Sequence, residues 1–429
     1  MLNLHKKLKA RLTTSLAEAL PQVEVNNNMF LNSDSRLALI KLDESLPDHG
    51  ALRDQLSEYV DSDFPAMVFV YDSLQDELAV NEYSQNGLKK LTEVAGFEDA
   101  PAHAARLIDA FQSLPRRYVF SIPLPSDVSE LFVPFVVDES LGPNIRLVKA
   151  TKEFAEKYPL DHTDEKRQSK IHGGSLLFPT PANVTYSENR IYLQIETQGF
   201  VGSYGGTVPA VRAERLLKSF LGLGLALRLL KVEDVYHMSP PTHSFFVHKA
   251  DGDGWTIHTK IDFDRDTSRV FDQLRSNDMF TGASKERKLS LAMLIVDELR
   301  AVFSAGDKAD ATTLGAGWLF ESYGVQDRRL SYVQSMVVLE VLLGDKAMSD
   351  AIGLGQLLRN RCAYLIGKSH EERRTLLKDF DELYAVRSQI VHRGKATLNF
   401  KERLLSNKLR DICNRVIQRE VDLLRGESK

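Results

Sequence analysis

The segment at residues 383–394, LYAVRSQIVHRG, carries the side chains of this chain that are best suited to chemistry. At 100° per residue on a helix, Tyr384, Ser388 and His392 form one stripe, and Arg387 lies on its flank. Histidine titrates near neutral pH, so His392 can transfer the proton of a ribose 2′-hydroxyl or of a leaving 5′-oxygen. Arginine stays charged and can hold the scissile phosphate through its planar fork of donors. The segment therefore predicts RNA cleavage without a metal.

A single copy of this segment is chemically incomplete, because one arginine and one histidine do not supply both an acid and a base. Two copies in a homodimer would supply both. Tyr384 and Ser388 are expected to line the cleft, and Ser388 can orient the phosphate. Glu340 lies in an apolar helical pattern and so needs a partner or an exposed side. It either supports the site or forms a structural ion pair with Arg359 or Arg361.

A purely structural role for the two central residues is the alternative. Arg387 can pair with Asp381, Glu382 or Glu340. His392 can be a residue of the last helical turn, where the helix dipole favours a cation. The residues of this segment alone leave both interpretations open.

The pair Arg387 and His392, with four residues between them, resembles the Arg-x4-His motif of the HEPN superfamily, and the surrounding segment resembles its Apea-like branch. The resemblance spans about residues 317–424, a quarter of the chain. Three upstream segments share it: WLFES at 318–322, VVLEVLLGD at 337–345 with Glu340, and LLRNR at 357–361.

This resemblance implies an all-helical HEPN domain whose two copies form one composite cleft in a homodimer. It implies a metal-independent endoribonuclease without a cofactor, which leaves a 2′,3′-cyclic phosphate and a 5′-hydroxyl, with tRNA as one substrate class. It also implies a role in anti-phage defence by abortive infection, with a phage-derived trigger sensed by the N-terminal part. Two alternatives stay open: a non-catalytic HEPN module that binds nucleic acid or protein, and an antitoxin-like regulator whose polar helix face meets a partner enzyme.

The elements that must position this segment predict an α+β multidomain chain. Residues 1–150 alternate between helical and strand patterns, and residues 151–284 form a second α+β region. The resemblance implies a sensory or regulatory role for this second region. The helices expected there are Ala51–Val60, Ala102–Leu114 and the buried Ala213–Leu230. The strands expected there are Met67–Tyr71, Tyr118–Ile122, Leu131–Val137, Arg190–Glu196, His243–His248 and Thr256–Phe263.

Residues 285–429 change in character to long amphipathic helices, which predict a helical bundle with short connections. These helices are Lys285–Ser304, a segment opening at Gly317–Tyr323, Leu330–Leu343, Leu354–Ile366, Glu371–Val391 and Phe400–Leu424. This part is mildly basic, with 25 Lys and Arg against 20 Asp and Glu, as suits a polyanionic substrate.

The composition of the chain excludes several classes of protein and of binding site. The chain has 429 residues and two cysteines, so we expect neither a disulfide framework nor a cysteine zinc site, and we expect a cytoplasmic protein. No run of eighteen or more apolar residues occurs and the N-terminus lacks an apolar signal region, so we expect no membrane attachment. The glycine-rich segment 199–206 lacks the lysine of a phosphate-binding loop, and the alternating aspartates at 262–266 lack the rest of a calcium loop.

Overall fold

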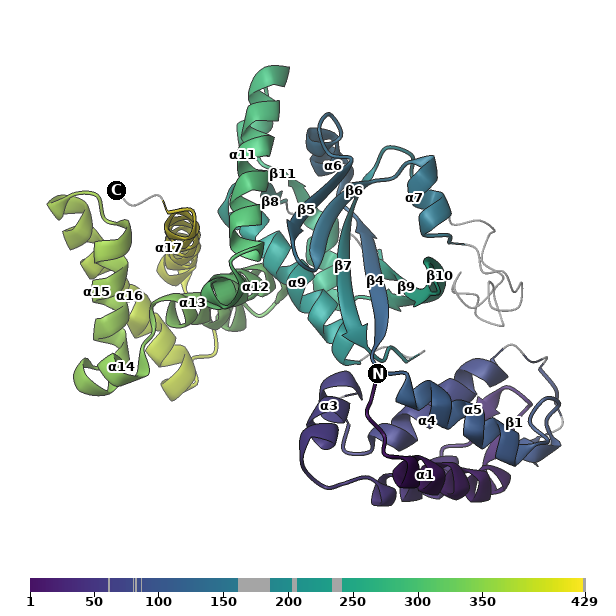
Figure 1. Cartoon of the computed structure of the whole chain (residues 1–429). Helices are drawn as coiled ribbons and strands as arrows, with labels where there is room; N and C mark the ends of the chain where they lie inside the picture. The colour runs from purple at the N-terminus through teal and green to yellow at the C-terminus, as the bar shows by residue number, and fades with distance from the viewer. Residues whose placement is uncertain are drawn as a thin grey trace.

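The computed structural model describes residues 1–60, 62–79, 81, 83–85, 87–160, 186–202, 207–233 and 241–426. Three parts follow one another along the chain (Figure 1): a small N-terminal unit, a central antiparallel sheet, and a group of C-terminal helices. The mixed α/β class with a helical C-terminal part is therefore confirmed. Of the helices that the structure describes, none combines the length and apolar content that a membrane crossing requires.

The N-terminal unit has its own core, which runs from Leu2 to Leu114 and includes Phe200. Its sheet has the order β2-β1-β3. Its helices are α1 (Lys6–Ala19), α2 (Ser35–Leu39), α3 (Ala51–Val60), α4 (Pro65–Leu78) and α5 (Ala100–Gln112). Its strands are β1 (Glu24–Asn26), β2 (Phe30–Leu31) and β3 (Leu88–Lys90), with short 3₁₀ helices at Leu20–Gln22, Ile40–Ser45 and Leu91–Glu93.

The strand predicted at Met67–Tyr71 is wrong, because these residues belong to α4. Pro65 stands in the first turn of α4, where its missing N–H costs nothing. The Asp43 carboxylate accepts hydrogen bonds from the backbone N–H groups of Ala66 and Met67, at 3.0 and 2.9 Å. A cap supplied from more than twenty residues upstream therefore starts a helix in a segment with strand-like composition.

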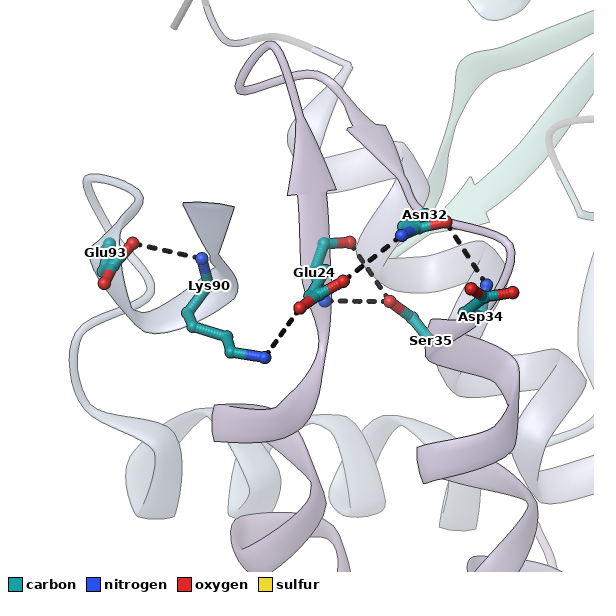
Figure 2. Close-up of polar contacts among 6 residues, drawn as sticks. All are labelled: Glu24, Asn32, Asp34, Ser35, Lys90 and Glu93. Carbon is teal, nitrogen blue, oxygen red and sulfur yellow. Dashed lines mark hydrogen bonds and ion pairs between the residues drawn. The ribbon is translucent and has the colours of Figure 1, made fainter. Parts of the chain in front are cut away.

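Polar side chains tie the strands of the N-terminal sheet to the adjoining turn (Figure 2). The Glu24 carboxylate accepts hydrogen bonds from Lys90 Nζ at 2.8 Å and from Asn32 Nδ2 at 3.2 Å. Ser35 Oγ accepts from Glu24 N–H and donates to Glu24 O. The hydrogen bond from Lys90 is the main reason that the pKa of Glu24 lies below its ordinary value. All of these groups hold one another, so this cluster is structural.

The central sheet contains six antiparallel strands in the order β10-β9-β4-β7-β6-β5. Its strands are β4 (Arg116–Pro123), β5 (Asp138–Gly142), β6 (Ile145–Lys149), β7 (Ile191–Gly199), β9 (Ser244–Asp251) and β10 (Gly254–Asp262). The short helices α6 (Ser126–Phe132) and α7 (Lys152–Lys157) lie between strands in the sequence. Because β6 pairs with β7, the predicted boundary at residue 150 falls inside one sheet and does not separate two units.

The two faces of this sheet have different coverings. Alternate β4 residues such as Tyr118 and Phe120 join the main core, whereas Val119 points to a smaller aromatic cluster that includes Phe154 of α7. The strand predicted at Leu131–Val137 is wrong, because α6 ends there at Phe132. Val128 and Phe132 are four residues apart and both buried, which is helical spacing.

The main core continues from the sheet into the C-terminal helices without a break. Helix α9 (Val208–Ala226) lies between them, and the predicted end at Leu230 is too late, since Arg228 has a left-handed backbone. Gly222 of α9 lies so close to α12 that an added Cβ would come within 1.8 Å of Ala316 O. Residue 285 therefore starts the helical part but does not start a separate core.

The remaining elements have the following bounds. A small sheet pairs β8 (Leu230–Val232) with β11 (Leu274–Ser276), next to α10 (Arg265–Gln273) and a 3₁₀ turn at Asp278–Phe280. The C-terminal helices are α11 (Lys285–Phe303), α12 (Asp310–Gly324), α13 (Arg328–Leu343), α14 (Lys346–Ile352), α15 (Leu354–Ile366), α16 (His370–Arg393) and α17 (Phe400–Leu424), with a 3₁₀ turn at Gly306–Ala309. Five of the helices predicted in this part are confirmed to within two residues at each end, but the segment expected to open at Gly317 starts at Asp310, and α14 was not predicted.

Candidate functional site

Helix α16 carries most of the candidate residues, and local sequence signals set both of its ends. Ser369 caps the N-terminus by accepting a hydrogen bond from Glu372 N–H, and acidic residues occupy the first turn. Gly394 ends the helix in the left-handed conformation that favours glycine. Buried residues at helical spacing, Leu376, Phe380, Leu383 and Val386, anchor the helix in the core. The candidate side chains therefore project from a rigid element.

Polar contacts from neighbouring helices hold α16 in place, three of them near the candidate residues. The Tyr332 hydroxyl of α13 donates to Leu383 O at 3.0 Å. Arg359 of α15 pairs with Asp381 at 3.0 Å, and Lys401 of α17 pairs with Glu382 at 3.0 Å. Both of the acidic residues on α16 that were possible partners of Arg387 are thus paired elsewhere.

Arg387 pairs with Glu340 of α13, the third possible partner. Arg387 Nη2 lies 3.2 Å from Glu340 Oε1, and the two side chains are only 19% and 22% exposed. The Arg387 guanidinium also lies 5.9 Å from the centroid of the Tyr384 ring, within the range of a cation–π contact. Arg387 Nε is buried, and within the described part of the chain it has no hydrogen-bond partner. Glu340 Oε1 is in the same position, so the two side chains form an ion pair without a hydrogen bond, and Nε of the cation is unsatisfied.

Glu340 does not pair with the two arginines of α15. Arg359 contacts Asp381, and Arg361 lies 3.5 Å from Asp345 while it donates to Leu343 O at 3.0 Å. Arg361 thereby holds the C-terminal end of α13, the helix that carries Glu340. The carboxylate of Glu340 is directed at the candidate site.

Tyr384 fills space that a glycine leaves open. A Cβ added to Gly355 of α15 would lie 2.9 Å from Tyr384 Cε1, so the ring packs directly over this glycine. The ring is half-buried and approaches Arg387 from its own helix. Tyr384 thus limits the directions in which the guanidinium can move.

His392 lies apart from this group. Its side chain is exposed in the last turn of α16, and Ser388 is half-buried between the two. Five residues rotate a helix position by about 140°, so Arg387 and His392 leave α16 in different directions. Within the described chain, His392 forms no hydrogen bond or ion pair with Arg387, Glu340 or Tyr384. One chain therefore brings Arg387, Glu340 and Tyr384 together and leaves His392 available to solvent.

The chain after His392 is held by residues that the sequence reasoning missed. Lys395 Nζ binds Glu402 Oε1 at 2.7 Å and Gln389 Oε1 at 3.0 Å. Asn399 and Glu402 form a reciprocal cap at the start of α17. Burial raises the pKa of Glu402, but hydrogen bonds from Lys395 and Asn399 outweigh it and leave this pKa below its ordinary value. The Asn-x-x-Glu spacing at 399–402 was a signal that could have identified this anchor.

Within the described ranges, no group of three or more His, Cys, Asp and Glu side chains is placed to hold a metal ion. Asp262 accepts from Ser244 Oγ, and Asp264 caps α10, so the alternating aspartates have structural partners. Cys362 and Cys413 are both buried free thiols, and burial raises the pKa of Cys362 to about 12. Part of the glycine-rich segment 199–206 lies outside the described residues.

Comparison of the chain with protein-family models gives no match, and comparison with curated proteins and with solved structures gives none either.

Proposed function

We propose that this protein is a metal-independent HEPN endoribonuclease that acts as a homodimer. The observation that carries the proposal is the partly buried cation of Arg387. It is positioned by Glu340 and Tyr384, keeps an unsatisfied donor at Nε, and precedes an exposed His392 on the same rigid helix. This is the pairing of a phosphate-binding cation with a proton-transfer group that the reaction requires.

The reaction would proceed by attack of the ribose 2′-oxygen on the adjacent phosphorus. Arg387 would bind the non-bridging oxygens and stabilise the charge that develops on them. His392 of one protomer would remove the 2′-hydroxyl proton, and its counterpart in the second protomer would protonate the leaving 5′-oxygen. The P–O5′ bond breaks as the new P–O2′ bond forms. The products are a 2′,3′-cyclic phosphate and a 5′-hydroxyl.

The biological setting in this proposal is anti-phage defence by abortive infection in the cytoplasm. RNA, with tRNA as one class, would be the substrate, and a phage-derived trigger would act through the N-terminal unit or the sheet. The direct packing of α12 on α9 supports this arrangement, because it joins the helical part to the sheet through shared core residues.

The test is to incubate the purified full chain with total RNA and with tRNA in EDTA and then to analyse the product ends. His392→Ala should abolish cleavage and leave folding and dimer formation unchanged. His370→Ala is the matched control, since His370 is also exposed on α16 but lies at its opposite end. Cleavage that persists in His392→Ala, or 3′-ends other than cyclic phosphate, would contradict the mechanism.

A non-catalytic HEPN module that binds nucleic acid or protein is the second candidate. The ion pair itself favours it, because Glu340 already balances the charge of Arg387 within one chain. This candidate predicts RNA binding without turnover, and binding that Arg387→Ala leaves unchanged. Toxicity of the wild-type chain on expression, with loss of toxicity in His392→Ala, would exclude it.

A further inference from the structure

A basic groove is lined by residues of α16 and α17. Figure 1 labels these two C-terminal helices. The volume of the groove is about 580 Å³. We define this α16–α17 groove by its charged residues: Arg374, Lys378, Asp379 and Glu382 on α16, and Lys401 and Lys408 on α17. Four cations face two carboxylates, so the groove carries a net charge of about two positive units.

The charges in the groove are unequally matched. Lys401 pairs with Glu382 and Lys408 pairs with Asp379, which uses both carboxylates. Arg374 and Lys378 are exposed and form no ion pair with any described residue. They stand four residues apart on one helix face, where like charges repel in the absence of an anion.

The pKa of Glu382 reports the same electrostatic field. Hydrogen bonding to Lys401 is the first cause that lowers this pKa, and the charges of Lys378 and Lys408 lower it further. An anionic ligand in the groove would therefore meet several ammonium groups at once. The Glu382 carboxylate is already paired with Lys401, so it repels a bound anion only weakly.

Apolar side chains accompany the cations. Leu404 belongs to the groove lining and is 54% exposed, and Phe400, one turn earlier on α17 and outside that lining, is 73% exposed. Residues four apart share a helix face, so Phe400 lies on the Leu404 side of α17, at the edge of the groove. Proteins that bind single strands stack bases on aromatic rings and hold phosphates on cations. Neither side chain contributes to the core.

The groove shares a helix face with His392. His392 follows Arg374 by eighteen residues, which is five full turns at 3.6 residues per turn. The two side chains therefore leave α16 on the same side, about 27 Å apart along the axis. This separation is the length of several nucleotides, so a strand bound in the groove can reach the exposed histidine.

We propose that the α16–α17 groove binds the backbone of single-stranded RNA and directs the strand toward His392. The direction toward a cutting site rests on the proposed ribonuclease function, whereas RNA binding by the groove does not. Arg374 and Lys378 contact phosphates, and Phe400 stacks on a base.

The test measures binding of a short, unstructured 2′-O-methyl RNA by fluorescence anisotropy at several salt concentrations. This probe lacks the attacking hydroxyl, so binding is measured independently of cleavage. Arg374→Glu with Lys378→Glu in the full chain should weaken binding at least about tenfold and make the salt dependence shallower by about 1.4 in log–log slope. Lys285→Glu with Arg287→Glu, the same change at an exposed site on α11, should bind like the wild type.

Three further variants separate the roles of charge and stacking from misfolding. Arg374→Gln with Lys378→Gln removes the charges without reversing them, and it should show an intermediate loss. Phe400→Ala should weaken binding about tenfold, and Phe400→Tyr should restore it. Circular dichroism and gel filtration identify any variant that has lost its fold.

The outcomes separate this proposal from the ribonuclease proposal. If the groove variant and its control on α11 weaken RNA binding equally, the proposal that the groove binds RNA is wrong. Failure of the wild type to bind RNA at low salt also overturns it, and points to an acidic protein segment as the occupant. Groove-dependent binding without cleavage of natural RNA upholds the groove, and it is the result expected both of a ribonuclease that lacks its trigger and of a non-catalytic module.

Discussion

The ion pair between Arg387 and Glu340 gives the most direct test of the site geometry. At 3.2 Å in a surrounding with an effective dielectric constant of about 20, two unit charges attract by about 5 kcal/mol before desolvation is counted. Breaking a fully buried pair costs about 3 to 5 kcal/mol, because one charge is left without a partner. Both side chains here are about a fifth exposed, so water compensates part of that cost. We expect Arg387→Ala or Glu340→Ala to lower the free energy of unfolding by about 2 kcal/mol.

The assay is a double-mutant cycle measured by urea unfolding at neutral pH. The double variant should be less destabilised than the sum of the two single variants, with a coupling energy of about 1 to 2 kcal/mol. Arg359→Ala with Glu340→Ala is the control cycle, since Arg359 pairs with Asp381 and should not couple to Glu340. Additive effects in the first cycle, or equal coupling in both, would refute the assigned pairing.

Three other perturbations test neighbouring features. Gly222→Ala should lower the free energy of unfolding by about 3 kcal/mol in thermal melts, because the new methyl group collides with Ala316 O; a wild-type melting temperature would contradict the packing of α9 on α12. Gly355→Ala should displace the Tyr384 ring and reduce RNA cleavage with only a small change in stability, since helix propensity offsets the contact; unchanged turnover would remove Tyr384 from the site. Burial lowers the pKa of His248 to about 4. Between about pH 6.5 and 4 the unfolded chain therefore binds a proton at this histidine that the folded chain does not bind. The free energy of unfolding should fall by up to about 3 kcal/mol as the pH decreases through this range. Urea titrations should show this loss and its reduction in His248→Gln, and an identical pH profile in that variant would contradict it.

The C-terminal helices could be predicted from the sequence because their signals are local. Leu354–Ile366 and Phe400–Leu424 have the bounds that their apolar periodicity and flanking residues indicate. The partner of Arg387 could be reduced to three candidates in the same way, since each was an acidic residue at plausible spacing. The choice among them depended on how α13, α15 and α17 surround α16, which no single helix encodes.

The errors arise where distant segments decide the local structure. Asp43 caps α4 from another part of the chain and converts the expected strand at Met67–Tyr71 into a helix. Strand β4 pairs with β7, whose residues follow about eighty positions later, so a boundary at 150 looked natural in the sequence but divides a sheet. The basic groove was missed for the same reason. Arg374 and Lys408 are ordinary charged residues until the antiparallel packing of α16 and α17 aligns them.

The contact between Gly222 and the backbone of Ala316 has a mechanical consequence. Two helices whose backbones are in contact cannot slide past one another without separating. We therefore expect α9 and α12 to move together as one rigid unit. Only a short turn separates α12 from α13, so this rigid unit includes the helix that carries Glu340. A displacement of the sheet would therefore reach α13, which carries Glu340, as a movement of packed helices. Removal of the sheet from the C-terminal helices would therefore remove the contact between α9 and α12 that transmits this displacement.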